Sequence, residues 1–262
     1  MIIIGEKINS SIPSMFEAIK NTDSEHIKKI TQLQIDCGAD YIDINAGLFE
    51  DEIEKLSYLL EAVLPLSPKG IAIDSTNPKT IEAVLKQVSG PKVIINSISL
   101  QKARLAGILP LIKAYNVGVV ALPLDDICTP KNADERVLLA EKLIDVFTKE
   151  GLALDYIYLD IIAETLSSSA SSGREALLAT ATLRKKYPEI HLSCGLSNVS
   201  YGLPKRKYLN TAFLTAAITM GLDTAIMDIT SPDMRMALKA ALLVNGQDDY
   251  CTEYISEFRE TF

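Results

Sequence analysis

Residues 70–78 of the chain, Gly70-Ile-Ala-Ile-Asp74-Ser-Thr-Asn-Pro78, contain one complete unit of the expected fold. The apolar run after Gly70 is almost uninterrupted, as in a parallel strand that is covered on both faces. Asp74 follows it directly. The next residues, Ser75 to Pro78, place helix-capping side chains before a proline that suits the first position of a helix. The stretch therefore predicts a strand, a polar turn and a helix in immediate succession.

Short apolar strands alternate with longer amphipathic stretches along the rest of the chain, which is typical of a parallel sheet. We expect strands at 2–4, 41–45, 70–74, 93–96, 117–122, 156–160, 191–195 and 224–227. We expect helices at 25–37, 50–64, 78–87, 101–115, 132–150, 173–186, 209–220 and 232–243. Eight such units fit an α/β fold of the (β/α)8 TIM-barrel type. No linker or charge block divides the chain, so we predict a single domain over residues 1–262.

An open, doubly wound sheet is the alternative architecture. A GxGxxG fingerprint after the first strand would favour it, and the sequence contains none. A P-loop and a GxSxG nucleophile elbow are also absent from the sequence.

Composition excludes several classes of partner. The chain has 262 residues, 23% of them charged, and a formal net charge of −8. An acidic chain is poorly suited to nucleic acid or to an anionic membrane surface, because both require clustered Lys and Arg. Its four cysteines are scattered without a CxxC pair, so we predict no metal site. The first residues lead straight into a strand with no targeting pattern, and we expect a cytoplasmic protein.

Four of the predicted strand ends form a coherent set: Asp74, Asn96, Asp160 and Asn198. The carboxyl ends of barrel strands surround one mouth, so residues far apart in the sequence can converge on one ligand there. The set consists of two carboxylates and two carboxamides. It suits a neutral heterocycle rich in N–H donors and ring nitrogens better than a phosphate or a carboxylate.

Each residue of this set also has a purely structural interpretation. Asp74 could cap the following helix, although Ser75, Thr76 and Asn77 can do this instead. Asp160 is followed by two isoleucines rather than by a helix start, so capping explains it less well. Asn96 could close a turn, and Asn198 could belong to an ordinary polar loop.

Further polar residues lie near the same predicted strand ends. Glu6, Lys7 and Asn9 follow the first strand and could extend the site. Asp43 and Asn45 end the second strand, and we interpret them as residues that brace the others. The evident cations near strand ends are Lys7, Lys205 and Arg206, each of which could equally be solvated surface charge.

Six short strings occur in a distinctive order: GEKIN (5–9), DIN (43–45), DST (74–76), INS (95–97), YLD (158–160) and GLSNVS (195–200). Together they resemble the pterin-binding (β/α)8 barrel family, which includes dihydropteroate synthase and the folate module of cobalamin-dependent methionine synthase. The closest resemblance is to the methyltetrahydrofolate:corrinoid/iron–sulfur protein methyltransferases. It covers essentially the whole chain.

The resemblance implies specific roles. Asp74, Asn96 and Asp160 would hold the pterin, Asn198 would reach its N5 as the catalytic residue, and Arg206 would position groups around the ring. Gly195, Ser197, Glu6 and Asn9 complete the predicted pterin-binding set. The resemblance also implies a homodimer.

The implied reaction moves the N5 methyl group of 5-methyltetrahydrofolate to the cobalt(I) of a corrinoid. The chain lacks the D-x-H-x-x-G segment that would hold cobalamin, so the corrinoid is expected only on a separate partner protein. Asn198 can donate a hydrogen bond but cannot ionise, so solvent or a water held by the carboxylates would supply the proton. The sequence leaves open which corrinoid protein is the partner, and whether acetyl-CoA synthesis or demethylation of methyl ethers or amines uses the reaction.

Two alternative functions remain at this stage. One is a dihydropteroate synthase-like condensation enzyme, which would need a pyrophosphate-binding set of basic residues that the sequence does not offer. The other is a non-catalytic pterin-binding subunit of a larger complex.

Overall fold

The structure, a computed structural model, describes residues 1–259, without the side chains of the last two. Its strands are β1 (Ile2–Asn9), β2 (Tyr41–Asn45), β3 (Gly70–Asp74), β4 (Lys92–Ser99), β5 (Gly118–Leu122), β6 (Ile157–Asp160), β7 (His191–Ser193) and β8 (Thr224–Met227). The α-helices of this range are α1 (Pro13–Lys20), α2 (Ser24–Asp36), α3 (Glu52–Val63), α4 (Pro78–Leu85), α5 (Lys102–Tyr115), α6 (Ala133–Lys149), α7 (Ser172–Lys186), α8 (Arg206–Thr219), α9 (Pro232–Val244) and α10 (Thr252–Arg259).

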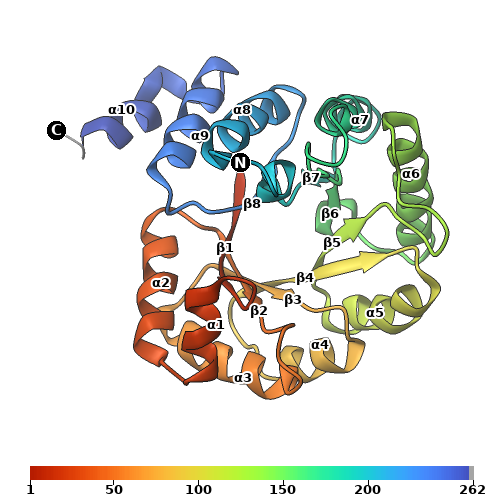
Figure 1. Cartoon of the computed structure of the whole chain (residues 1–262). Helices are drawn as coiled ribbons and strands as arrows, with labels where there is room; N and C mark the ends of the chain where they lie inside the picture. Colours follow the sequence, from red (N-terminus) through yellow and green to blue (C-terminus); the bar gives the residue numbers. More distant parts are fainter. Residues whose placement is uncertain (260–262) are drawn as a thin grey trace.

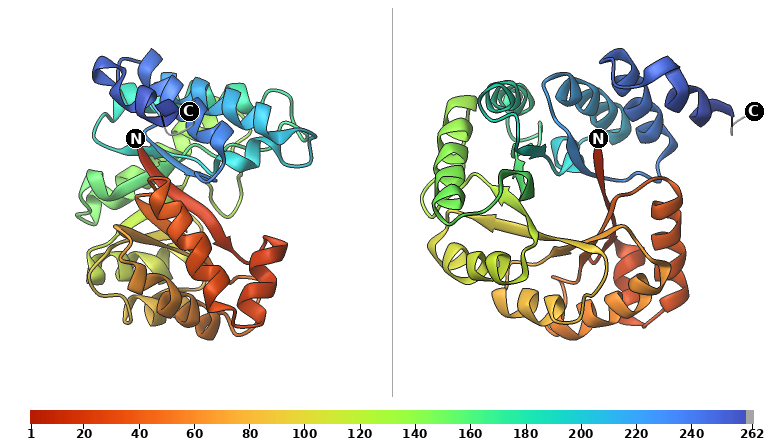
Figure 2. Two further views of the ribbon diagram at one scale, coloured as in Figure 1. Left: turned by 90° about the vertical axis from the view of Figure 1, so that its left-hand side faces the viewer. Right: turned by 180° about the vertical axis from the view of Figure 1, so that it is seen from behind.

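All the strand pairs are parallel, and the sheet runs in the order β7-β6-β5-β4-β3-β2-β1-β8. The helices surround the strands, and α10 lies outside this ring beside α9 (Figure 1). The view from behind shows the same arrangement (Figure 2, right). The predicted (β/α)8 barrel is therefore confirmed. The last three residues of the predicted domain, 260–262, lie outside the described range.

The barrel closes along a seam between β7 and β8. A single bridge joins Gly195 to Ile226, whose N–H donates to the carbonyl of Cys194 at 2.9 Å. At the other end of the seam, Asp223 accepts from the backbone N–H of Leu192 at 2.9 Å. The same carboxylate lies 3.0 Å from a nitrogen of His191 and 3.0 Å from the guanidinium of Arg184. The N–H of Asp223 also donates to the carbonyl of Leu192 at 3.2 Å. Side chains and this one backbone bond therefore hold the seam at its amino-terminal end, whereas regular ladders hold the other strand pairs.

The structure differs from the predicted elements mainly at α1, β1 and α8, and β4 also runs three residues beyond its predicted end, to Ser99. The prediction has no counterpart of α1, a short helix in which Pro13 occupies the first turn and Met15, Ala18 and Ile19 are buried. Strand β1 runs on to Asn9, with a shift of register between Gly5 and Ile8. Helix α8 begins three residues earlier than predicted, at Arg206, so this side chain belongs to its first turn.

None of the helices within residues 1–259 is long and apolar enough to cross a bilayer. The core is instead formed by the inner sides of the helices and both faces of the sheet, and it is dominated by Ile, Leu, Val and Ala side chains.

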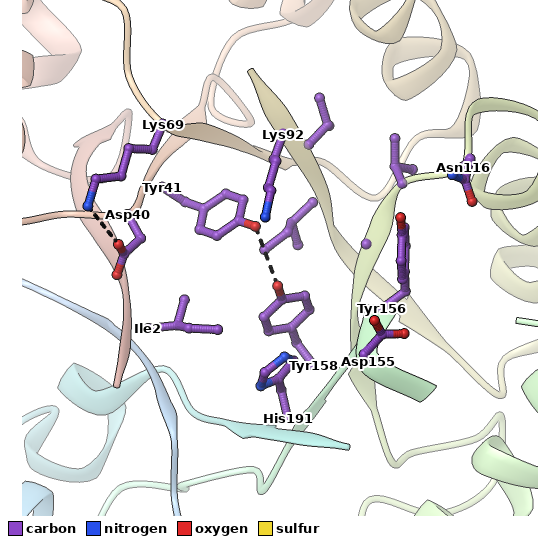
Figure 3. Close-up of a pocket in the computed structure, with 14 residues that line it drawn as sticks. Ile2, Asp40, Tyr41, Lys69, Lys92, Asn116, Asp155, Tyr156, Tyr158 and His191 are labelled. Carbon is purple, nitrogen blue, oxygen red and sulfur yellow. Dashed lines mark hydrogen bonds and ion pairs between the residues drawn. The ribbon is translucent and has the colours of Figure 1, made fainter. Parts of the chain in front are cut away.

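The amino-terminal end of the barrel is closed by two tyrosines. Tyr41 and Tyr158 point toward each other across the interior, with their hydroxyl oxygens 3.4 Å apart, and His191 stacks on Tyr158 (Figure 3). A cavity of about 600 Å³ lies against these rings, lined by residues at the starts of the strands. It is at the opposite end of the barrel from Asp74, Asn96 and Asp160, so it is separate from the predicted site.

Gly70 makes room for this tyrosine pair. A Cβ atom on Gly70 would lie 2.3 Å from the ring of Tyr41, well inside any normal contact. We predict that Gly70→Ala lowers the free energy of unfolding by about 1–3 kcal/mol, the usual cost of overpacking a core. Urea denaturation measures this change.

Gly47→Ala is the matched control, since its nearest neighbours would be 3.6 Å away. If Gly70→Ala proved as stable as this control, the proposed crowding of Tyr41 would be wrong.

Candidate active site

Four polar residues form one row across the carboxyl ends of adjacent strands. Asn9 on β1 is the register partner of Asn45 on β2, which is in turn the partner of Asp74 on β3. Asp74 is the partner of Asn96 on β4. Parallel register therefore brings together side chains that are up to 87 residues apart, by the difference of positions 9 and 96.

Asp74 does not cap the helix that follows it. Asn77 caps α4 by accepting from the N–H of Lys79 at 3.0 Å, and Ser75 accepts from the N–H of Asn77. The carboxylate of Asp74 instead accepts from the side-chain amide of Asn45 at 2.9 Å. Burial raises the pKa of Asp74 to about 6, against the lowering effect of this hydrogen bond.

Asn96 is held from one layer deeper in the barrel. Its amide nitrogen donates to Asp43 at 3.2 Å, and Asp43 is 2% exposed. Burial, and then the negative charge of Asp74, raise the pKa of Asp43 well above its ordinary value. Asp43 and Asn45 thus support Asn96 and Asp74, in agreement with the bracing role that we expected for them.

Asp160 ends β6 and is 7% exposed. One of its oxygens accepts from the backbone N–H of Ile162 at 2.7 Å. Burial raises its pKa to about 6, while hydrogen bonds from the N–H groups of Ile162 and Gly195 and the charge of Arg136 act in the lowering direction. No helix follows within this turn, so the carboxylate is not a helix cap.

The segment after β7 forms a short 3-10 helix, Leu196–Ser200, that carries Asn198. The side chain of Asn198 folds back over Gly195, where a Cβ atom would lie 2.9 Å from the amide nitrogen of Asn198. Gly195 therefore allows a close approach that another residue would block. Asn198 is exposed, so its carboxamide is accessible at the mouth.

Glu6, Ser197 and Arg206 form a second connected group. The hydroxyl of Ser197 donates to Glu6 at 2.6 Å, which links β1 to the 3-10 helix that follows β7. Arg206 donates to the carbonyl of Ser197 at 2.6 Å and to the hydroxyl of Ser200 at 3.0 Å. Arg206 therefore fixes the turn that carries Asn198.

Asp228 is a mouth residue that the sequence analysis did not identify. It follows β8 and pairs with Lys7 of β1 at 3.1 Å, and it also accepts from the hydroxyl of Thr230. A carboxylate directly after an apolar strand was the available signal, and it is the same signal that indicated Asp74 and Asp160. This pair neutralises Lys7, one of the three cations expected near the strand ends.

The structure therefore connects the predicted residues in two groups at one end of the barrel. Asp74 and Asn96 are joined through β2 side chains, and Glu6, Ser197 and Arg206 join across the β1 and β7 ends. Asp160 accepts from the N–H of Gly195, which lies two residues before Ser197 of the second group. Asn9 lies in the polar row, but its side-chain oxygen accepts from the N–H of Ser11 and serves its own turn.

The mouth is thus rich in oxygen acceptors, including three carboxyl groups whose pKa is raised by burial. The nearby cations Lys7 and Arg206 bind to other groups of the protein. The sequence of residues 5–228 matches the family described as pterin binding enzymes, and the chain belongs to that family.

Among curated relatives, the chain is 34% identical to the methylcorrinoid:tetrahydrofolate methyltransferase of Eubacterium limosum, over 99% of this chain and 97% of that protein. It is 29% identical to the methionine synthase of Mycobacterium tuberculosis over 87% of this chain, which corresponds to 20% of that much longer enzyme.

Solved structures of dihydropteroate synthases share the fold. The enzyme from Xanthomonas albilineans, in complex with 7,8-dihydropteroate, superposes with a TM-score of 0.74 at 17% identity, covering 93% of each chain. The enzyme from Coxiella burnetii, in complex with pteroic acid, gives 0.70 at 17% identity over 94% of each chain. At these identities the likeness concerns the architecture alone.

The raised pKa of Asp160 makes a prediction about stability and pH. Its pKa is about 6 in the folded chain, against about 3.9 for an unfolded aspartate. The folded state therefore binds more protons between these values, and stability falls as pH rises from about 4 to about 6. The contribution of Asp160 to this fall is up to about 3 kcal/mol.

Asp160→Asn removes the titrating group and should be more stable relative to the wild type at pH 7.5 than at pH 4.5. Denaturant unfolding at both pH values tests this. The exposed Asp145→Asn on α6 serves as the control and should leave the pH dependence as it is. An equal offset between Asp160→Asn and wild type at both pH values would contradict the argument.

Proposed function

We propose that the protein transfers the methyl group between N5 of 5-methyltetrahydrofolate and the cobalt of a corrinoid that a separate protein carries. The observation that carries the proposal is the mouth itself: buried and half-buried carboxylates and half-buried carboxamides line it, and the exposed carboxamide of Asn198 stands at its edge. The similarity to the Eubacterium limosum enzyme, whose name describes this chemistry, supports it.

Recognition of the pterin follows from the acceptors. Asp74 accepts from the amide of Asn45, and Asp160 accepts from the backbone N–H groups of Ile162 and Gly195. The lone pairs left over can accept hydrogen bonds from the N–H groups of a pterin ring. The side-chain nitrogen of Asn96 donates to Asp43. Its side-chain oxygen can therefore accept a hydrogen bond from the ligand as well.

The chemistry requires N5 to become a better leaving group. The N5–CH3 bond breaks as cobalt(I), acting as nucleophile, takes the methyl carbon, and the bonding electron pair stays on N5. A donor that strengthens its contact with N5 only as this charge develops lowers the barrier without tightening substrate binding. Asn198 is the residue proposed for this role, because its amide is exposed while Arg206 fixes the turn beneath it.

A proton must finally reach N5. A carboxamide does not titrate, so Asn198 stabilises the developing charge without supplying that proton. Solvent, or a water held by the carboxylates, is the proposed source.

The two directions of transfer use the same site. The name of the Eubacterium limosum enzyme, methylcorrinoid:tetrahydrofolate methyltransferase, gives methylcorrinoid as the methyl donor and tetrahydrofolate as the acceptor. Because forward and reverse reactions share one transition state, the residues that stabilise it act equally in both directions. The equilibrium constant and the ratios of methylated to unmethylated folate and corrinoid then decide the net direction.

Two observations speak against a dihydropteroate synthase-like condensation. Lys7 is paired with Asp228, and the Nε and Nη2 atoms of Arg206 donate to Ser200 and Ser197, so both cations already have partners within the protein. A cavity of about 570 Å³ beside Asp74 is also lined by carboxylates, namely Glu50, Asp51, Glu52 and Glu54. Negative charge at this position disfavours a polyanionic substrate.

Other parts of the proposal rest on the resemblance. The corrinoid is placed on a separate protein that docks over the mouth, and the chain is proposed to form a homodimer. The boundaries of the domain are proposed as residues 1–262. A cytoplasmic location is also proposed, and it is supported by four cysteines that are all free thiols.

A direct assay tests the function. Purified protein is mixed with 5-methyltetrahydrofolate and cob(I)alamin, and formation of methylcobalamin is followed spectroscopically, then the reverse reaction with methylcobalamin and tetrahydrofolate. Transfer in either direction is expected. Tight folate binding without transfer to free cobalamin or to any corrinoid protein would favour the non-catalytic subunit, and formation of dihydropteroate from its precursors would favour the condensation enzyme.

The first prediction for this site concerns affinity. Asp160→Ala removes an acceptor and leaves ligand donors unsatisfied, which costs about 1–3 kcal/mol. We expect the dissociation constant of 5-methyltetrahydrofolate to rise roughly tenfold or more. Titration calorimetry measures it, with Asp145→Ala as the control on an exposed helix face. An unchanged constant for Asp160→Ala would remove this residue from the site.

The second prediction separates binding from rate. Asn198→Ala should lower kcat by roughly 10²–10³, the range for losing one transition-state donor. Its effect on the folate dissociation constant should be smaller, because Asp74, Asn96 and Asp160 still hold the ring. Single-turnover rates and calorimetry on the same samples give both quantities.

Asn96→Ala is the matched comparison, since it removes the same functional group from a position proposed for binding. It should raise the dissociation constant more than Asn198→Ala does. Parallel losses of rate and affinity in Asn198→Ala would make Asn198 an ordinary binding residue.

A further inference from the structure

Arg136, in the first turn of α6, is a fully buried arginine close to the proposed site. Its side chain is 0% exposed, although a guanidinium stays charged in proteins. A charge that is removed from water in this way is tolerated only where hydrogen bonds compensate it. The position therefore requires acceptors around the whole guanidinium group.

Those acceptors come mainly from the turn that follows Asp160. The Nε atom of Arg136 donates to the carbonyl of Ile161 at 3.1 Å, and Nη2 donates to the carbonyl of Ile162 at 3.1 Å. Nη1 donates to the carbonyl of Asn132 at 3.2 Å, which ties the turn to the start of α6. Glu164 lies 3.8 Å from Nη2.

The turn that Arg136 holds is strained. Ile162 has a φ angle of +48°, in the left-handed region that a β-branched residue rarely adopts. Such a conformation persists only where surrounding contacts impose it. Two contacts do so here: Arg136 binds the carbonyl of Ile162, and Asp160 accepts from its N–H at 2.7 Å.

One residue is therefore held on two sides by groups of opposite charge. The carbonyl of Ile161 and the N–H of Ile162 belong to one planar peptide group. Turning that carbonyl away from Arg136 would therefore also turn the N–H away from Asp160, and the carboxylate would lose the bond that orients it. The guanidinium thus fixes Asp160 through the backbone, with no direct hydrogen bond between the two side chains.

The charge of Arg136 acts on the same carboxylate. It lowers the pKa of Asp160, against burial, which raises that pKa to about 6. The charged groups that face Arg136 are Glu164 of the turn, Glu175 of α7, Glu135 of α6 and Asp160 itself. Directly after β7, the pKa of the Cys194 thiol is raised by burial and then by the negative charges of Asp160 and of Glu6 on β1.

We propose that Arg136 is a positioning residue of the pterin site, which holds the strained turn after β6 and keeps the carboxylate of Asp160 aimed and charged for the ligand. This rests on the proposed function, since it assumes that Asp160 accepts from the pterin. Arg136 does not touch the ligand, and it acts through Ile162 and through its charge.

The experiment measures the dissociation constant of tetrahydrofolate by calorimetry between pH 5 and pH 8.5. For Arg136→Met we expect binding at pH 7 to weaken roughly tenfold. We also expect the acidic limb of the pH profile to move upward by about one pH unit, as for the loss of one nearby opposite charge. Arg136→Lys should return the limb toward its wild-type position, because it restores the charge.

Two controls separate positioning from general destabilisation. Arg184→Met removes another partly buried arginine, which donates to the carbonyls of Gly221, Pro188 and Ile190 at the opposite end of the barrel. It should lower stability without moving the pH profile. In an Asp160→Asn background, Arg136→Met should likewise leave the profile in place, because the titrating group is gone.

Arg136→Met combined with Ile162→Gly covers the case in which Arg136→Met alone does not fold. Glycine adopts the left-handed conformation without strain, so the double variant should fold and still show the displaced limb. The role of Arg136 would be overturned if the wild type binds tetrahydrofolate and both Arg136→Met and the double variant show the same pH profile of binding as the wild type. Wild-type protein that fails to bind any reduced folate would instead overturn the proposed function.

Discussion

Buried carboxylates at the ends of parallel strands are the constraint on which the rest of this structure depends. A carboxylate removed from water needs donors close by, and the mouth supplies few cations for that purpose. Neighbouring strands supply amides instead: Asn45 serves Asp74, Asn96 serves Asp43, and backbone N–H groups serve Asp160. These partners are adjacent only because the eight strands share one direction and a fixed register. The result is a set of acceptors with spare lone pairs and raised pKa values, which suits a donor-rich neutral ring.

The sequence was sufficient for the architecture because its signals are local. A continuous apolar run followed by a polar turn and a proline, as in Gly70–Pro78, identifies a strand and a helix within nine residues by count of those positions. Helix α1 was missed because it has only eight residues and begins at Pro13, shortly after β1 ends at Asn9, so its apolar positions resemble those of a connecting segment.

Contacts across the barrel were less accessible to sequence reasoning. The bond between Glu6 and Ser197 joins residues 191 positions apart, and no local pattern indicates it. Arg136 carries no local sign of a role near Asp160, since the link runs through backbone carbonyls of another turn. Asp228 could have been found from its place after β8, by the argument already applied to Asp74. The strand ends were thus predictable one by one, whereas their partners required the folded chain.

The seam between β7 and β8 affects how easily the turn that carries Asn198 opens. At the amino-terminal end, the Asp223 cluster clamps the two strands, whereas near the mouth a single bridge at Gly195 and Ile226 joins them. Near the mouth, the bond from Ile226 to Cys194 joins the two strands, so separating them there should cost less free energy than separating strands within the regular ladders. Amide hydrogens of residues 195–200 should accordingly exchange with solvent through brief excursions of this corner alone, while those of β2 to β5 exchange only when the whole barrel unfolds. The floor end of this seam should therefore stay closed while its mouth end opens locally.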